Sequence, residues 1–123
     1  MGEKEPSRVY DLEDRTFRFA KRTSDFVEKL QKTLSNIEYG RQLVRSSGSV
    51  AANYVEANES LSKKDFIMRV KICRKEAKES RLWIRLVRCD EDMKLEQQML
   101  FGESTELMKI FGAILTKATS PKS

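Results

Sequence analysis

Apolar residues recur along the chain at intervals of three and four, the spacing that places side chains on one face of an α-helix. This pattern predicts four helices, over residues 12–34, 37–59, 63–88 and 93–117. The third helix has the most regular apolar stripe, which consists of Phe66, Val70, Cys73, Ala77, Ser80, Ile84 and Val87. Four long helices joined by short breaks predict an all-α fold, an antiparallel up-down-up-down four-helix bundle.

The breaks between the predicted helices carry residues that cap helix ends. Asp11 is placed to cap the first helix, Ser35 or Asn36 the second, and Ser62 the third. The three acids at 90–92 precede the fourth helix, where they suit the positive end of its dipole. These signals support four separate helices.

The domain organisation follows from these boundaries. We expect a flexible segment over residues 1–10, a single four-helix-bundle domain over 11–117 and a disordered tail over 118–123. Both prolines lie in the two end segments, so no helix breaker interrupts the bundle. The small residues at 46–52 predict a close approach of helices, with a loop as the alternative.

Several large apolar residues fall outside the predicted core stripes. Trp83 and Leu86 lie on another flank of the third helix, and Phe17 and Phe26 lie off the stripe of the first. They predict a second buried surface and therefore a homo-oligomer. A broad monomer core is the alternative.

Composition removes several classes of protein. The chain has no histidine, which excludes Ser-His-Asp triads, His-ligated zinc and Glu-x-x-His di-iron sites. No apolar run reaches the roughly 18 residues of a membrane span, and the charged start is unlike a signal peptide. Cys73 and Cys89, placed on one predicted helix, are too far apart for a disulfide. Unpaired thiols suit a reducing, cytoplasmic location.

The net charge of +5 is unevenly distributed. Residues 63–89 hold ten basic and three acidic residues, whereas residues 90–117 hold three basic and six acidic ones. Six cations of the third helix follow one another at steps of three and four and share one face: Lys71, Arg74, Lys78, Arg81, Arg85 and Arg88. This line predicts a nucleic-acid-binding surface that contacts phosphates. The alternatives are a solvated surface, or compensation by the acidic start of the fourth helix or by acids of a neighbouring subunit.

Two Glu-x-x-Glu pairs raise an enzymatic alternative. They are Glu76 with Glu79 and Glu103 with Glu106, each pair on one face of a helix. Two such pairs on neighbouring helices could hold Mg²⁺, as in the all-α nucleotide pyrophosphatases. Structural acids paired with arginine are the simpler interpretation, and we predict no catalytic residue, metal or cofactor.

Five segments of the chain form an ordered set of motifs: QLVRSSGSV (42–50), NYVEA (53–57), SKKDF (62–66), CRKEAKES (73–80) and the last helix from 106 to 115. In these segments the chain resembles the four-helix-bundle proteins encoded in intervening sequences of bacterial 23S ribosomal RNA genes. The resemblance spans residues 10–115, although Ala57 stands where glycine is common in that family.

This resemblance implies a four-helix protomer, often assembled as a homopentameric ring, and no established enzymatic activity. A similar fold occurs in the accessory proteins of diversity-generating retroelements, which associate with RNA and a reverse transcriptase. The resemblance also implies that Asn53 and Glu56 are a buried amide and carboxylate, paired with an arginine of the third helix.

These inferences predict a non-enzymatic, oligomeric, cytoplasmic helical protein that binds structured RNA or RNA–DNA hybrid through the third helix. Its partners would be further copies of the chain, RNA, and a reverse transcriptase or another protein, with no membrane. The alternatives are a metal-dependent nucleotide pyrophosphatase and a protein–protein adaptor.

Overall fold

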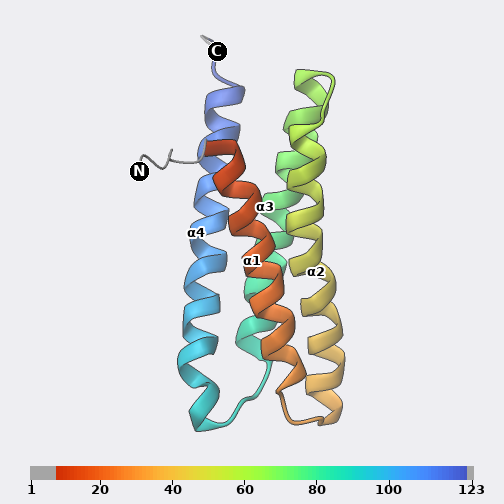
Figure 1. Cartoon of the computed structure of the whole chain (residues 1–123), viewed down its shortest axis with the longest axis vertical. Helices are drawn as coiled ribbons and strands as arrows, with labels where there is room; N and C mark the ends of the chain where they lie inside the picture. The colour runs from red at the N-terminus through yellow and green to blue at the C-terminus, as the bar shows by residue number, and fades with distance from the viewer. Residues whose placement is uncertain (1–7, 122–123) are drawn as a thin grey trace, which may run out of the picture.

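The computed structural model describes residues 8–121, which form helices and contain no strand. The long helices are α1 (Arg8–Glu28), α2 (Leu34–Asn58), α3 (Lys63–Leu86) and α4 (Lys94–Ala118), and a 3₁₀ turn, η1 (Glu91–Met93), precedes α4. The α1–α2 and α3–α4 connections lie at one end of the molecule and the α2–α3 connection at the other (Figure 1). Each helix packs on the next, and α4 also packs on α1, so the four surround one core. No helix within this range combines the length and apolarity that a membrane crossing requires.

The first two helix boundaries differ from the sequence prediction. Helix α1 begins at Arg8 and ends at Glu28, so Asp11 lies inside it and does not cap it. Helix α2 begins earlier than expected because Thr33, rather than Ser35 or Asn36, is its cap: the Thr33 hydroxyl accepts a hydrogen bond from the backbone N–H of Asn36, at 3.1 Å. The third cap is confirmed, since the Ser62 hydroxyl accepts from the N–H of Asp65.

Asn36 has a long-range role instead of the expected cap. Its side-chain amide donates to the carbonyl oxygens of Gln31 and Arg88, and its Oδ1 accepts from the backbone N–H of Arg88 at 2.9 Å. Asn36 is buried, so these bonds satisfy a polar group away from water. The amide thereby joins the α1–α2 connection to the end of α3.

The core contains the stripe predicted for the third helix. Six of its seven members are buried and Phe66 is half-buried. The small residues at 46–52 are helical, as expected, and the hydroxyls of Ser46 and Ser80 meet at 2.8 Å between α2 and α3. A side chain at Gly40 would place a Cβ only 2.9 Å from Val27, so glycine allows α1 and α2 to approach there.

Other core predictions need correction. Phe26 is buried in the main core rather than on a second surface, whereas Phe17 is 58% exposed. Trp83 stacks on Tyr39 of α2 with ring centroids 5.8 Å apart, so the protomer itself covers part of it. On α4, Ile110 and Ile114 are only half-buried. The buried positions of that helix are Leu100, Ser104, Leu107, Phe111 and Leu115.

The flexible ends expected at 1–10 and 118–123 include residues 1–7 and 122–123, which lie outside the described residues.

Cys73 and Cys89 are both free thiols, and Cys89 follows α3 rather than lying on it. Burial raises the pKa of the Cys73 thiol to about 12.

Candidate nucleic-acid interface

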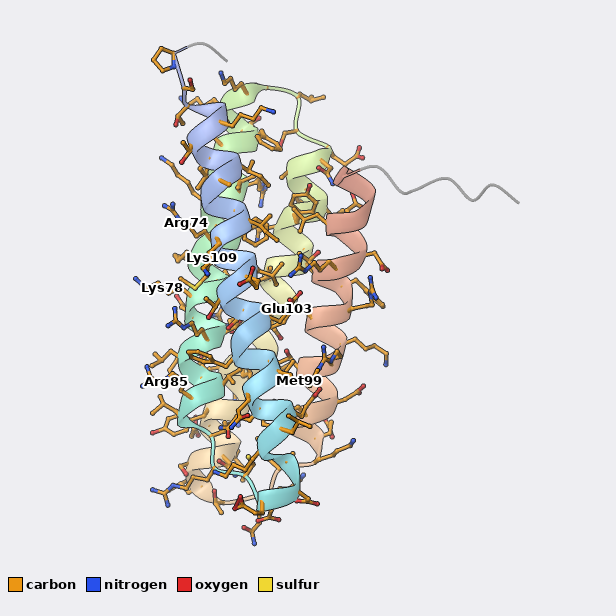
Figure 2. All side chains as sticks on the ribbon, turned by 90° about the vertical axis from the view of Figure 1, so that its left-hand side faces the viewer. Arg74, Lys78, Arg85, Met99, Glu103 and Lys109 are labelled. Atoms are coloured by element: carbon orange, nitrogen blue, oxygen red, sulfur yellow. The ribbon has the colours of Figure 1, made fainter. Side chains whose placement is uncertain are left out.

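The six cations predicted from the sequence lie on and just beyond α3, and we call them the basic face: Lys71, Arg74, Lys78, Arg81, Arg85 and Arg88. Five are exposed, and Arg81 is half-buried. Arg74, Lys78 and Arg85 project from α3 along one side of the molecule (Figure 2). Because α3 ends at Leu86, Arg88 extends this side beyond the helix.

No member of the basic face forms an ion pair within residues 8–121. The carboxylates of α4 are engaged elsewhere. Glu103 accepts two hydrogen bonds from the guanidinium of Arg15 of α1, at 2.7 and 2.9 Å, and Glu96 accepts from Arg22. The Glu96 hydrogen bond also raises the pKa of Arg22. The acids at 90–92, which precede α4, form no ion pair with the basic face within residues 8–121 either, so the expected compensation by the acidic start of the fourth helix is not seen in the protomer.

Two uncharged side chains of α4, Phe101 and Met108, contact Arg81 of the basic face. The guanidinium of Arg81 lies over the ring of Phe101, 4.7 Å from its centroid, and its Nη1 lies 3.8 Å from the sulfur of Met108. Figure 2 shows Glu103 on the far side of α4 from Arg85. The α3–α4 boundary is thus cationic, with its one half-buried guanidinium held against an aromatic ring.

A depression of about 340 Å³ opens at this boundary, next to Arg85. Its α3 wall is Ile84 and Arg85, and its α4 wall is Gln97, Gln98 and Phe101. The Gln97 amide donates to the carbonyls of Ile84 and Val87, at 2.9 and 3.2 Å, which fixes this part of the wall. The sequence did not identify Phe101 as part of this site, because an apolar residue at that position of the fourth helix is expected in the core.

The two Glu-x-x-Glu pairs do not come together. Glu76 is 6% exposed and, with Glu79, binds Arg45 of α2, at 3.4 and 3.0 Å. Glu103 binds α1, as described above, and Glu106 binds Lys109 on its own helix. The described residues contain no group of three or more side chains that could hold a metal ion. Arginine pairing, the simpler interpretation of these acids, agrees with this geometry.

The polar residues of α2 match the family expectation in part. Asn53 accepts a hydrogen bond from Nη1 of Arg69, an arginine of α3, at 2.9 Å. Asn53 is only half-buried and Glu56 is exposed, so the expectation that both are buried was wrong. Glu56 occupies the outer side of α2, away from the helices that would bury it.

The described chain is therefore a four-helix-bundle protein with an uncompensated cationic side. The family model of the 23S rRNA-intervening sequence protein matches residues 9–113, and the chain belongs to that family. A solved structure from Bacteroides thetaiotaomicron, a protein with unknown function from the S23 ribosomal protein family, is 25% identical with a TM-score of 0.75. The match covers 88% of this chain and 97% of that one. The chain matches no curated protein.

Proposed function

We propose that this chain is a non-enzymatic, oligomeric helical protein that binds structured RNA, or RNA–DNA hybrid, through the basic face. The observation that carries the proposal is the set of six cations without ion-pair partners within residues 8–121, of which Arg81 contacts the uncharged side chains of Phe101 and Met108 on α4. Like charges at helical spacing repel one another and destabilise an isolated helix. Phosphates bound to these cations would reduce the repulsion, and their binding would release counterions from the nucleic acid.

The dimensions of the basic face suit a nucleic-acid backbone. From Lys71 to Arg85 the helix rises about 21 Å, enough to follow several successive phosphates. Arginine forms bidentate bonds to phosphate, and three of the five cations on the helix itself are arginines. Contacts to phosphates carry no sequence information, so we expect low sequence specificity.

Assembly into a homo-oligomer is the second part of the proposal. Four exposed apolar residues on the α1 and α2 side, which we call the apolar face, are Phe17, Ile37, Val44 and Val55. Ile37, Val44 and Val55 share one flank of α2, and Ile37 lines a depression with Val27 of α1. Phe17 lies one turn beyond Glu13, which accepts a hydrogen bond from Asn58 of α2.

A ring requires two different patches on each subunit, because a head-to-tail contact joins unlike surfaces. The second patch that we propose is on the outer side of α3, where Met68, Leu82 and Leu86 are 40–47% exposed. A pentameric ring would repeat the basic face in every subunit, and avidity would then strengthen weak single-site binding. The cytoplasm as location, and a reverse transcriptase or another protein as partner, stay predictions.

The direct test is charge reversal on the basic face. Lys78→Glu with Arg85→Glu changes two exposed cations without touching the half-buried Arg81. We expect RNA affinity to fall by at least about tenfold and the log–log salt slope to flatten by about one unit for each lost phosphate contact. Fluorescence anisotropy with a labelled hairpin RNA, over a salt series, measures both quantities.

The matched control is Lys21→Glu with Lys29→Glu, which makes the same charge change at exposed positions of α1 and of the α1–α2 connection. We expect the control to weaken binding far less, because these lysines are not on α3. Equal losses in the two double variants would show a general charge effect and contradict the basic face as the site. Absence of RNA binding by the intact wild type would instead favour the protein–protein adaptor.

A further inference from the structure

The depression beside Arg85 differs from the rest of the basic face because it combines an aromatic ring with amide and guanidinium groups. The cations elsewhere on the face offer only charge. Here Phe101 presents an apolar ring, while Gln98 and Arg85 stand at the rim. Both rim residues are exposed, and neither forms a hydrogen bond or ion pair through its side chain within residues 8–121.

Phe101 is held in place from the other side. Arg81 reaches the ring from the direction of Met108, which lies two turns further along α4. The depression lies in the opposite direction, towards Gln97 and Gln98, one turn before Phe101. Phe101 therefore both contacts the Arg81 guanidinium and lines the depression.

The wall of the depression is also fixed. Gln97 uses its amide nitrogen on two α3 carbonyls, and its Oε1 accepts from the Cys89 thiol at 3.3 Å. Its polar groups are therefore not available to a ligand. Gln98, by contrast, offers both a donor and an acceptor, the combination that pairs with the edge of a nucleobase. The volume of about 340 Å³ is at the lower end for ligand pockets and suits one planar ring system.

We infer that this depression binds a single unpaired nucleobase of an RNA loop or bulge, stacked beside Phe101 and hydrogen-bonded by Gln98. Arg85 holds the phosphate of the same nucleotide, and the cations nearer the α2–α3 end hold the backbone that follows. The inference rests on the proposed function and adds to it: the protein distinguishes unpaired from paired RNA at this one position. Aromatic stacking of this kind accepts any base, which agrees with low sequence specificity.

The test compares three RNAs with the same number of phosphates: a hairpin with an unpaired loop, the same hairpin with an abasic loop, and a fully paired duplex. The variant is Phe101→Leu, which keeps an apolar side chain but removes the ring. We expect it to bind the ordinary hairpin about tenfold more weakly. Its binding of the other two RNAs should change less than about twofold, with an unchanged salt slope, because no phosphate contact is lost.

Two further variants protect the test against a folding defect. Gln98→Ala changes an exposed side chain, so the core is intact, and we expect a loss of about three- to fivefold for the ordinary hairpin alone. Leu61→Ala removes an exposed apolar side chain from the α2–α3 connection, outside both faces, and should leave the preference for the ordinary hairpin unchanged.

The outcomes separate the two proposals. If the wild type binds none of the three RNAs at low salt, the proposed function and this inference both fail. If the wild type binds all three equally, or if Phe101→Leu and Gln98→Ala keep its preference for the ordinary hairpin, only the base-binding depression is refuted. Loss of that preference in both variants, with duplex binding retained, supports the inference.

Discussion

The α3–α4 boundary and the α1–α2 boundary expose different chemistry. The first carries the basic face, with no carboxylate from residues 8–121 paired to it. The second carries the apolar face, with exposed phenyl and aliphatic groups. Among the described residues each helix packs only on its two neighbours around the bundle, so these two boundaries lie on opposite sides of the molecule.

The other two boundaries explain how this separation arises. At α1–α4 and at α2–α3, arginines of one helix bind carboxylates of the other. Those pairs use acids of α3 and α4 that would otherwise neutralise the basic face. The modest net charge of the chain is therefore concentrated on one side, because acids of α3 and α4 pair with arginines at the other boundaries. In our proposal the apolar face and the basic face therefore act on opposite sides, while the second subunit patch, on the outer side of α3, lies on the same helix as the basic face.

The largest effect that we expect is loss of assembly when a charge is placed in the apolar face. Val44→Glu places a charge in the apolar face, where burial against a second copy would leave it unpaired. We expect the assembly to dissociate to the 14.3 kDa protomer with unchanged helical content. Light scattering coupled to size-exclusion chromatography measures the mass, and circular dichroism the helicity.

The matched control for assembly is Ala52→Glu. It adds the same charge at an exposed position of α2, about 80° around the helix from Val44. The control should keep the wild-type mass. A Val44→Glu protein with the mass of the wild type would show that the apolar face is not a subunit contact.

A smaller effect should follow from opening one of the ion-paired boundaries. Arg45→Met leaves the buried Glu76 without its guanidinium partner, and we expect the free energy of unfolding to fall by about 1–2 kcal/mol. Arg45 is half exposed, so water compensates part of the loss. Urea denaturation measures the change.

The control for this boundary is Arg18→Met, which breaks an exposed pair with Asp14 and should cost less than about 0.5 kcal/mol. Neither variant alters the basic face, so RNA affinity should stay at the wild-type value in both. A marked loss of RNA affinity in Arg45→Met would mean that the α2–α3 boundary takes part in binding, against the proposed separation.

The smallest effect concerns the core beneath both faces. Burial holds the folded-state pKa of Cys73 at about 12, above its ordinary value near 9. Between these pH values the unfolded chain loses a proton that the folded chain keeps, so stability declines as pH rises. We expect a loss of about 1 kcal/mol by pH 10, measured by urea denaturation at several pH values.

Cys73→Val is the control for the alkaline decline, because it removes the titrating thiol from the core. We expect its stability to fall less steeply above pH 9. Burial also raises the pKa of Tyr54, which adds a decline of the same sign at higher pH in both proteins. Identical pH profiles for the variant and the wild type would contradict the assignment to Cys73.

Local patterns predicted the parts of this fold that depend on neighbours in sequence. The α3 stripe and the Ser62 cap are correct because spacing and capping act within one or two turns. The end of α1 was misplaced because apolar spacing continues past Glu28. Leu30 is buried although it lies outside the helix, so the pattern alone could not distinguish helix from connection.

The candidate site was predictable only in part for a similar reason. Spacing identified the cations of the basic face, since they share one helix flank. Spacing could not show that Glu103 pairs with an arginine of α1, or that Arg45 pairs with Glu76 and Glu79. These ion pairs depend on how one helix is oriented against another, which is a tertiary property. Phe101 lacks any local signal, since an aromatic residue on an amphipathic helix is typical of a core.

The last turn of α3 shows how the cations at its end keep their donors. The carboxyl end of a helix has carbonyl groups without intrahelical partners, and lysine or arginine side chains often bend back to occupy them. Here neutral amides bind the carbonyls at this end: Gln97 donates to Ile84 in the last turn and to Val87 just after it, and Asn36 donates to Arg88 beyond the helix. The guanidinium groups of Arg85 and Arg88 therefore do not bind these carbonyls, and both side chains are exposed. They supply positive charge at the carboxyl end of the helix, whose dipole would otherwise repel an anion.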